Sequence, residues 1–173
     1  MKRQGGFTLI EMVVVIVILG ILAVTAAPRF LNLQGDARAS TMEGLKGAIN
    51  GATGIVYGKA AVEGKEQLDG RDEDVSDAVV DNIKISFGYP QADADGLTAS
   101  LKLDLASDNN KGEWRVAYDA DDAPYKAAYT LAAISLPSGD SPFEQIQATE
   151  CYVEYTEAVS GTEAEVKVIN TGC

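Results

Sequence analysis

Residues 5–28 read GGFTLIEMVVVIVILGILAVTAAP, and the only ionisable side chain among them is that of Glu11. As an α-helix, the part from Phe7 to Pro28 would be roughly 33 Å long at ~1.5 Å per residue, enough to cross a hydrocarbon core of ~30 Å. Lys2 and Arg3 precede it, and by the positive-inside rule they would keep that end in the cytoplasm. The stretch therefore predicts a membrane-spanning helix, with the rest of the chain outside the cytoplasm.

A cleaved secretory signal peptide is the competing interpretation, with Ala26 and Ala27 as small residues at its cleavage site. The apolar core of such a signal has roughly 7 to 15 residues and no charge, whereas here the apolar run is longer and Glu11 stands near its beginning. A carboxylate at membrane depth costs on the order of 2.5 to 3.5 kcal/mol and by default marks function. Glu11 therefore needs a partner, and a newly formed amino terminus is the available one.

Composition excludes several classes of function. The chain has 173 residues, enough for one domain with an appendage. Its 26 acidic residues outnumber its 14 basic ones, and the formal net charge of -12 would repel a phosphate backbone, so no nucleic-acid partner is expected. The chain has no histidine, and we see no nucleophile–base pair or phosphate-binding loop, so we expect neither an enzyme nor a cofactor.

Residues 5–11 (GGFTLIE), followed by the Val/Ile/Leu run, resemble the class III leader and N-terminal helix of type IV pilins and their type II secretion relatives. The resemblance implies that a prepilin peptidase removes residues 1–6 by cutting between Gly6 and Phe7, and that the new amine of Phe7 is then methylated. Met12 replaces the Leu that is more usual in this family, a swap that conserves side-chain volume.

Phe7 and Glu11 are the expected filament-assembly residues. They lie about one helical turn apart, so the new amine and the acid reach a similar membrane depth. We expect the Phe7 amine of an incoming subunit to pair with Glu11 of a subunit already in the fibre, an interaction that low dielectric strengthens. In the alternative interpretation, Glu11 serves only as a recognition residue for the peptidase.

Gly20 and Pro28 predict a locally weak stretch of helix. Glycine lacks a stiffening side chain, and proline removes one backbone donor. The resemblance implies that this stretch loosens or extends in a filament, while a simple proline kink in a continuous helix is the alternative.

Residues 29–60 predict an amphipathic helix that lies on a core, because apolar residues recur mostly at intervals of three to four: Phe30, Ala37, Met42, Leu45, Ile49, Ala52 and Val56. A second row repeats at intervals of 3, 4, 3 and 4 and predicts close backbone packing rather than a hinge: Gly44, Gly47, Gly51, Gly54 and Gly58. Residues 27–61 resemble the mannose-sensitive haemagglutinin (MSHA) branch of type IVa pilins, found in marine and aquatic bacteria.

Residues 61–173 predict a loop, a β-sheet and a C-terminal region. The charged segment 63–81 reads as a surface connection whose acidic residues form a solvated face. Short β-branched or aromatic runs separated by turn residues predict antiparallel strands at 83–89, 114–118, 129–136, 151–156 and 166–169. Residues 97–105 fit either a helix or a strand, and we favour a helix.

Cys151 and Cys173 are the two cysteines. They predict one disulfide that closes a C-terminal loop in an oxidising compartment, worth about 3 kcal/mol. Two free structural thiols are the alternative.

Two acidic clusters are candidate calcium sites, Asp93 with Asp95 and Asp119 with Asp121 and Asp122. Neither matches the EF-hand pattern, so we interpret them as solvated turn aspartates and expect no metal.

The predicted fold is α+β and is that of a type IV pilin. A long N-terminal α-helix, membrane-spanning over 7–28 and amphipathic over 29–60, packs on an antiparallel β-sheet with a disulfide-closed C-terminal loop. The function that the resemblance implies is that of a major pilus subunit for attachment, haemagglutination and biofilm formation. A type II secretion pseudopilin is the alternative, against which the C-terminal cysteines weigh, and a membrane-tethered periplasmic enzyme or binding module is a third.

The expected partners are further copies in a helical filament, the prepilin peptidase, the inner-membrane assembly machinery and inner-membrane lipid before assembly. A surface carbohydrate is a further candidate. The expected location is the inner membrane of a Gram-negative bacterium and then the extracellular pilus.

Overall fold

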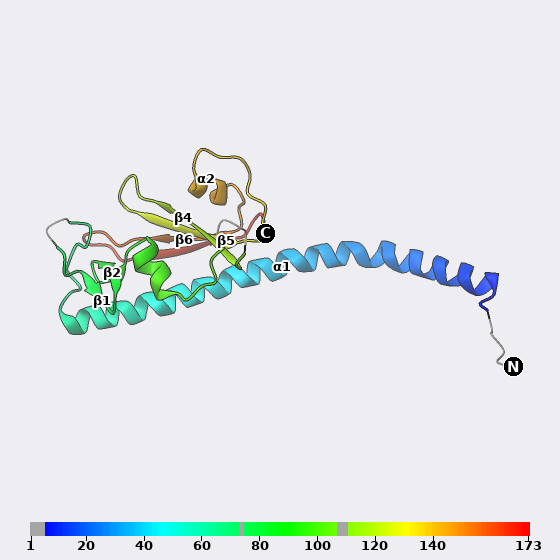
Figure 1. Ribbon diagram of the computed structural model, residues 1–173, viewed down its shortest axis with the longest axis horizontal. Coiled ribbons are helices and arrows are strands. Elements are labelled where there is room, and N and C mark those ends of the chain that lie inside the picture. The colour runs from blue at the N-terminus through cyan, green and yellow to red at the C-terminus, as the bar shows by residue number, and fades with distance from the viewer. Residues whose placement is uncertain (1–5, 73–74, 107–110) are drawn as a thin grey trace. The chain divides into compact units, whose positions relative to one another are not determined.

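The computed structural model describes residues 6–72, 75–106 and 111–173, and for residues 27–32 of the first helix it describes the backbone alone. Contacts divide the chain into two compact units, one ending at Ala37 and the other beginning at Arg38. Helix α1, Leu9–Glu63, contributes to both units (Figure 1).

The first unit contains the apolar half of α1. Residues Leu9–Ala26 have a mean hydropathy of 2.8, and none of this segment is buried. Apolar side chains cover it on all sides, and Phe7, Ile10 and Val24 are each at least 70% exposed. A helix with this surface requires a membrane or other subunits around it, which fits the spanning segment that the sequence predicts.

Helix α1 ends at a glycine stop. Gly64 has a φ of +69°, a left-handed conformation that glycine adopts without strain. The Gly64 N–H donates to the Ala61 carbonyl (3.2 Å) and the Lys65 N–H to the Ala60 carbonyl (2.8 Å). These two bonds satisfy the last carbonyls of the helix and form a Schellman motif.

A four-stranded antiparallel sheet forms the centre of the second unit, in the order β4-β5-β6-β7. Its strands are β4 (Trp114–Asp119), β5 (Lys126–Leu131), β6 (Tyr152–Thr156) and β7 (Glu165–Ile169). The part of α1 that belongs to this unit lies along one face, and the short helix α2, Pro142–Gln147, lies against the other (Figure 1).

Successive side chains of β6 point to opposite faces of the four-stranded sheet. Val153 and Tyr155 are fully buried in the core that Met42, Leu45 and Ile49 of α1 also enter. On the opposite face, Tyr152 packs with other buried residues, namely Ala117, Ala128, Phe143 and Ile146. The predicted amphipathic stripe is confirmed at these α1 positions and at Val56, which enters a second buried cluster.

One member of the predicted stripe differs, and another is not tested. Ala37 is exposed, and it belongs to the first unit, in which none of the described side chains is buried. The side chain of Phe30 lies outside the described residues.

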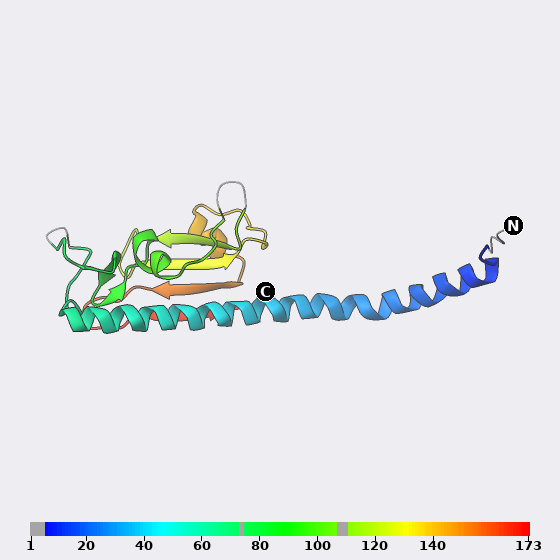
Figure 2. The same cartoon turned by 60° about the horizontal axis from the view of Figure 1, so that its bottom comes forward.

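A second, three-stranded sheet lies near the C-terminal end of α1 (Figure 2), in the order β1-β2-β3. Its strands are β1 (Val79–Val80), β2 (Ile83–Ser86) and β3 (Tyr89–Pro90). Two-residue turns with positive φ join them, Asp81-Asn82 and Phe87-Gly88, as tight hairpins require. A Cβ on Gly88 would stand 2.9 Å from the Tyr57 ring, so this turn needs glycine.

The structure corrects two predicted elements and adds one. The predicted strand 83–89 is a hairpin, because Phe87-Gly88 turns the chain between β2 and β3. The predicted strand 129–136 begins earlier and ends earlier, since β5 spans Lys126–Leu131 and pairs with β4 and β6 from its first residue. Helix α2 is additional, and its capping box between Ser141 and Glu144 is a signal that the sequence contains.

Residues 97–105 combine both predicted alternatives. A short π-helical turn, η1 (Ala94–Thr98), is capped by the Asp93 side chain, and the helical backbone continues to Ser100. The favoured helix is therefore confirmed for the first part only. Leu105 instead forms an isolated bridge with Trp114.

The glycine row of α1 does not pack within the chain. Gly44, Gly47, Gly51, Gly54 and Gly58 are all exposed, and a Cβ on any of them would meet no described atom within 4 Å. The prediction of close packing is therefore wrong for the isolated subunit. The helix continues through all five positions, so they form no hinge either.

An ion-pair network holds the segment before β1. Arg71 donates to both oxygens of Glu157, from Nε at 3.0 Å and from Nη2 at 2.6 Å, and its guanidinium lies 4.4 Å from the centre of the Tyr125 ring. The Glu157 side chain is only 1% exposed, and it also accepts from the Ala92 N–H (2.6 Å). Arg71 thus ties this surface segment to a buried acid of the sheet side of the unit.

Tyr129 and Tyr155 are fully buried with satisfied hydroxyls. The Tyr129 hydroxyl is hydrogen-bonded to that of Thr98 (2.7 Å), and the Tyr155 hydroxyl donates to the Pro90 carbonyl (2.6 Å). Burial raises the pKa of both tyrosines above the usual value, because desolvation disfavours the phenolate.

Raising the pH above about 10, where unfolded tyrosine ionises, is expected to destabilise the second unit. The folded pKa values are raised, so this contribution to the free energy of unfolding is complete below pH ~10 and is lost as the pH rises towards the folded values. In a pH titration followed by phenolate absorbance, Tyr129 and Tyr155 should ionise only when the protein unfolds, in a step after the exposed tyrosines. Tyr129→Phe should reduce the amplitude of that step. Reversible ionisation of all tyrosines without loss of near-UV circular dichroism would contradict this.

Candidate functional site

The expected cleavage junction lies just before α1. Gly6, Phe7 and Thr8 have non-helical backbone, and α1 begins at Leu9. A Cβ on Gly6 would meet no described atom within 4 Å, and Phe7 is 81% exposed. The bond between Gly6 and Phe7 is therefore open to a peptidase. The rest of the expected leader, residues 1–5, lies outside the described residues.

Thr8 and Glu11 close the first turn of α1. Glu11 Oε2 accepts two hydrogen bonds, one from the Thr8 N–H (2.8 Å) and one from the Thr8 hydroxyl (2.8 Å). In return, the Glu11 N–H donates to Thr8 Oγ1 (3.3 Å). This reciprocal pattern is a capping box. The sequence-based prediction missed it, although Thr-x-x-Glu before an apolar run is its sequence signal.

Helix α1 is continuous through Gly20 and Pro28. Between them, the Thr25 hydroxyl donates to the carbonyls of Ile21 (3.3 Å) and Leu22 (3.1 Å). Such back-bonding slightly destabilises helices and often bends them. The local weakness predicted for this stretch stays a prediction.

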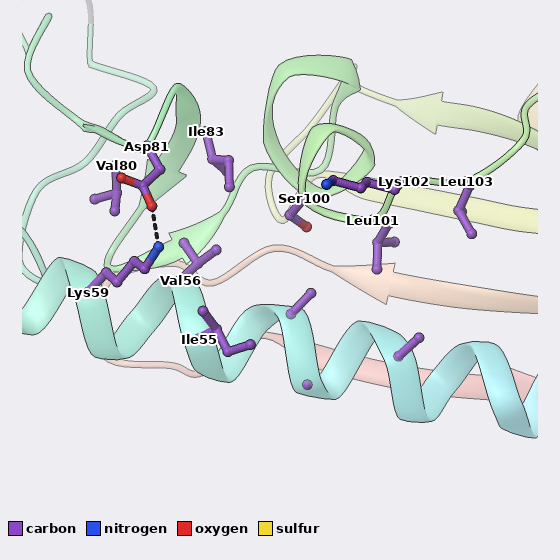
Figure 3. Close-up of a pocket in the computed structure, with 13 residues that line it drawn as sticks. Ile55, Val56, Lys59, Val80, Asp81, Ile83, Ser100, Leu101, Lys102 and Leu103 are labelled. Atoms are coloured by element: carbon purple, nitrogen blue, oxygen red, sulfur yellow. Dashed lines mark hydrogen bonds and ion pairs between the residues drawn. The ribbon is translucent and has the colours of Figure 1, made fainter.

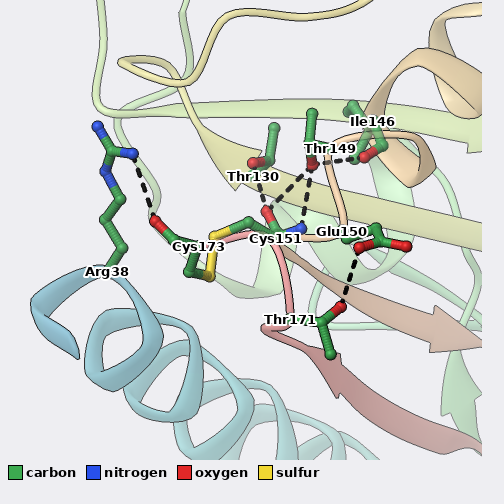
Figure 4. The surroundings of a disulfide bond; sticks show 8 residues. All are labelled: Arg38, Thr130, Ile146, Thr149, Glu150, Cys151, Thr171 and Cys173. Carbon is green, nitrogen blue, oxygen red and sulfur yellow. Dashed lines mark hydrogen bonds between the residues drawn. A yellow bond between two sulfur atoms is a disulfide. The ribbon is translucent and has the colours of Figure 1, made fainter. Parts of the chain in front are cut away.

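A disulfide joins Cys151 to Cys173, with a Cα–Cα distance of 4.8 Å across a sequence separation of 22 (Figure 4). The predicted bridge is thus confirmed, and Cys151 is fully buried directly before β6. Its carbonyl accepts from the Thr130 hydroxyl (2.7 Å). Arg38 of α1 donates to the Cys173 carbonyl (3.4 Å), so the C-terminal loop is fixed to both the sheet and the helix.

The first acidic cluster is paired with cations, and the second has a hydrogen bond within itself. Asp93 lies 3.4 Å from Arg71, and Asp95 lies 2.7 Å from Lys84. In the second cluster, Asp119 accepts from the Asp121 N–H (3.5 Å). Among the described residues, no group of three or more acidic or cysteine side chains could hold a metal ion.

An apolar pocket of about 590 Å³ lies beside α1 in the second unit (Figure 3). Its lining includes Ala52, Ile55, Val80, Leu101 and Leu103. A Lys59–Asp81 ion pair lies among the lining residues, which Figure 3 shows spanning from α1 to the β1–β2 turn. The pocket presents packing surface rather than the nucleophile and base that a reaction would need.

Comparison with known proteins gives a family match for the N-terminal segment. Residues 1–27 match the family described as the prokaryotic N-terminal methylation motif. Together with the apolar helix, the antiparallel sheet and the C-terminal disulfide, this match defines a type IV pilin-like α+β architecture.

A more particular similarity is to the type IV narrow pilus major component PilA5 of Thermus thermophilus. The two are 41% identical over 63 residues, which is 36% of this chain. The match spans about half (51%) of that curated relative. No solved structure matches the chain. The first match covers residues 1–27, and the second relative is by its name a structural component of a pilus.

Proposed function

We propose that this chain is the major structural subunit of a type IV pilus. The observation that carries the proposal is the exposed Gly6–Phe7 junction just before the apolar segment Leu9–Ala26 of α1, none of which is buried. A peptidase can cut at this junction, and the helix then has two environments that remove its apolar surface from water. One is the inner membrane before assembly, and the other is the packed interior of a filament.

The glycine row supports assembly through α1. Its five positions form a face that has no side chains and on which no other described part of the chain packs. Another helix can therefore approach the backbone closely. The pocket beside Gly51 and Ile55 adds apolar surface next to this face. We assign both to contacts between subunits, because contacts of this kind would compensate the cost of glycine in a helix.

Glu11 gives the filament its register. The methylated amine of Phe7 in an incoming subunit pairs with Glu11 of a subunit already in the fibre. Desolvation offsets part of the attraction, so the pair selects the axial position of the subunit more than it adds adhesion energy.

The assembled filament would mediate attachment, haemagglutination and biofilm formation on the outside of a Gram-negative cell. This finer role rests on the resemblance of residues 27–61 to the MSHA branch. A type II secretion pseudopilin would share the first 27 residues and the helix, and the C-terminal disulfide is the feature that favours the pilus.

Electron microscopy of filaments sheared from cells, with N-terminal sequencing of their subunit, tests the proposal. The expected result is long surface filaments whose subunit begins at methylated Phe7 and carries the Cys151–Cys173 linkage. Processed protein confined to the inner membrane of cells that secrete exoproteins would favour the pseudopilin. Protein that retains residues 1–6 would exclude both.

Gly6→Val is expected to leave an uncut precursor in the inner membrane, because a branched side chain crowds the scissile position of the peptidase. The substitution meets no described atom of the chain itself, so it should not disturb folding. Mass spectrometry of the membrane fraction measures the cut. Gly20→Val is the matched control, because a Cβ on Gly20 also meets no described atom within 4 Å. The peptidase should cut this variant normally between Gly6 and Phe7. Normal cutting of Gly6→Val would contradict the assigned junction.

A further inference from the structure

The two carboxylate oxygens of Glu11 differ in their surroundings. Oε2 accepts both hydrogen bonds from Thr8, each of 2.8 Å. For Oε1, the structure records no hydrogen bond within the described residues. The side chain is therefore held at one oxygen by its own helix and presents the other to whatever surrounds the helix.

The capping box does not depend on the leader. Its donors and acceptors all belong to Thr8 and Glu11, and the Met12 N–H donates to the Thr8 carbonyl (3.3 Å). Cutting between Gly6 and Phe7 breaks none of these bonds. The first turn of α1 can thus stay closed while a new amine forms one residue before its cap.

The box also lowers the cost of placing Glu11 in hydrocarbon. Hydrogen bonds to an ionised carboxylate are stronger than those between neutral groups, and an unpaired charge at this depth is expensive. Two bonds from within the chain satisfy part of the carboxylate before any partner arrives. A side chain that is already held also loses less conformational entropy when a partner binds.

We propose that Thr8 is a positioning residue for Glu11. Its N–H and hydroxyl fix the carboxylate through Oε2, so that Oε1 is free to accept from the amine of another copy during assembly. This inference rests on the proposed function. It adds that the Thr8 hydroxyl, which does not itself touch the partner amine, sets how readily the pair forms.

Thr8→Val and Thr8→Ser test the role of the hydroxyl, because valine has nearly the shape of threonine without the donor and serine keeps it. With Thr8→Val as the sole major subunit, the chain should be cut at Phe7, form its disulfide and reside in the membrane. The yield of sheared filaments should fall about fivefold, which corresponds to the ~1 kcal/mol typical of a lost cap. Thr8→Ser should restore a yield close to that of the wild type.

A second measurement follows the contact itself. In the mature full-length protein in detergent micelles, the Thr8 amide proton should resonate downfield while Glu11 accepts from it, and Glu11→Ala should move it upfield. Glu43→Ala, on an exposed part of the same helix, is the matched control and should leave it unmoved.

Three results would overturn the inference. The first two are a wild-type filament yield from Thr8→Val and a Thr8→Ser yield as low as that of Thr8→Val. The third is an uncut Thr8→Val precursor, because it would show that Thr8 serves recognition by the peptidase. The proposed function fails separately, if the wild-type chain itself forms no filaments. In that case the amide resonance would still show whether Thr8 holds Glu11.

Discussion

Glu11→Gln, as the sole major subunit, is expected to give a pilin that is cut, folded and membrane-resident but that assembles almost no filaments. Glutamine keeps an oxygen that can accept from Thr8, so the capping box is preserved and the helix start stays intact. The substitution removes the negative charge and puts an NH2 donor where the second oxygen was, so that nothing there accepts from the incoming amine. The Phe7 amine of an incoming subunit then enters a low-dielectric site without its partner.

The expected effect is large because removing one partner of a desolvated ion pair costs about 3 to 5 kcal/mol. Each added subunit would bear this cost, so we expect the yield of sheared filaments to fall at least about a hundredfold. Quantitative immunoblotting of sheared material against the membrane pool measures the ratio. Glu11→Ala should be at least as severe, since it removes the cap as well as the charge.

Glu43→Gln is the matched control for this experiment, because it makes the same change at an exposed position of the same helix. It should assemble normally. Abundant normal pili from Glu11→Gln would rule out pairing in trans, and an uncut Glu11→Gln precursor would instead support the view that Glu11 serves peptidase recognition.

Arg71→Ala is expected to lower the free energy of unfolding of the second unit by about 3 to 5 kcal/mol, because it leaves the Glu157 carboxylate buried without its cation. The Glu157 side chain is 1% exposed, against 26% for Arg71, so water cannot readily replace the lost bonds. The Ala92 N–H would be its one remaining donor among the contacts of the described residues. Loss of the guanidinium also removes its contact with the Tyr125 ring.

Urea unfolding of the full-length protein in detergent, followed by near-UV circular dichroism, measures this loss. Lys84→Ala is the matched control, since it breaks the exposed Lys84–Asp95 pair nearby and should cost less than about 1 kcal/mol. The double variant Arg71→Met with Glu157→Met should regain much of the stability, because it leaves no unpaired charge. Equal losses from Arg71→Ala and Lys84→Ala would show that the buried pair has no special role.

The sequence alone specifies those parts of this protein that depend on neighbouring residues. The apolar run, Gly64 at the end of α1 and Thr8 with Glu11 at its start each act through contacts within a few positions along the chain. Such signals can be read without knowing the fold. The disulfide was also predictable, because only one pairing of two cysteines exists.

The tertiary structure decided what depends on partners far apart along the chain. Arg71 and Glu157 are separated by 86 positions, and no local pattern shows that a charged loop residue will find a buried acid. Lys126 enters β5 because Asp119 and Thr156 pair with it on its two sides, although its own residue type does not favour a strand. Leu97 and Leu105 are divided between η1 and a bridge to Trp114 for the same reason. Pairing and burial override local propensity wherever the energy of packing against distant residues exceeds the small preferences of the backbone.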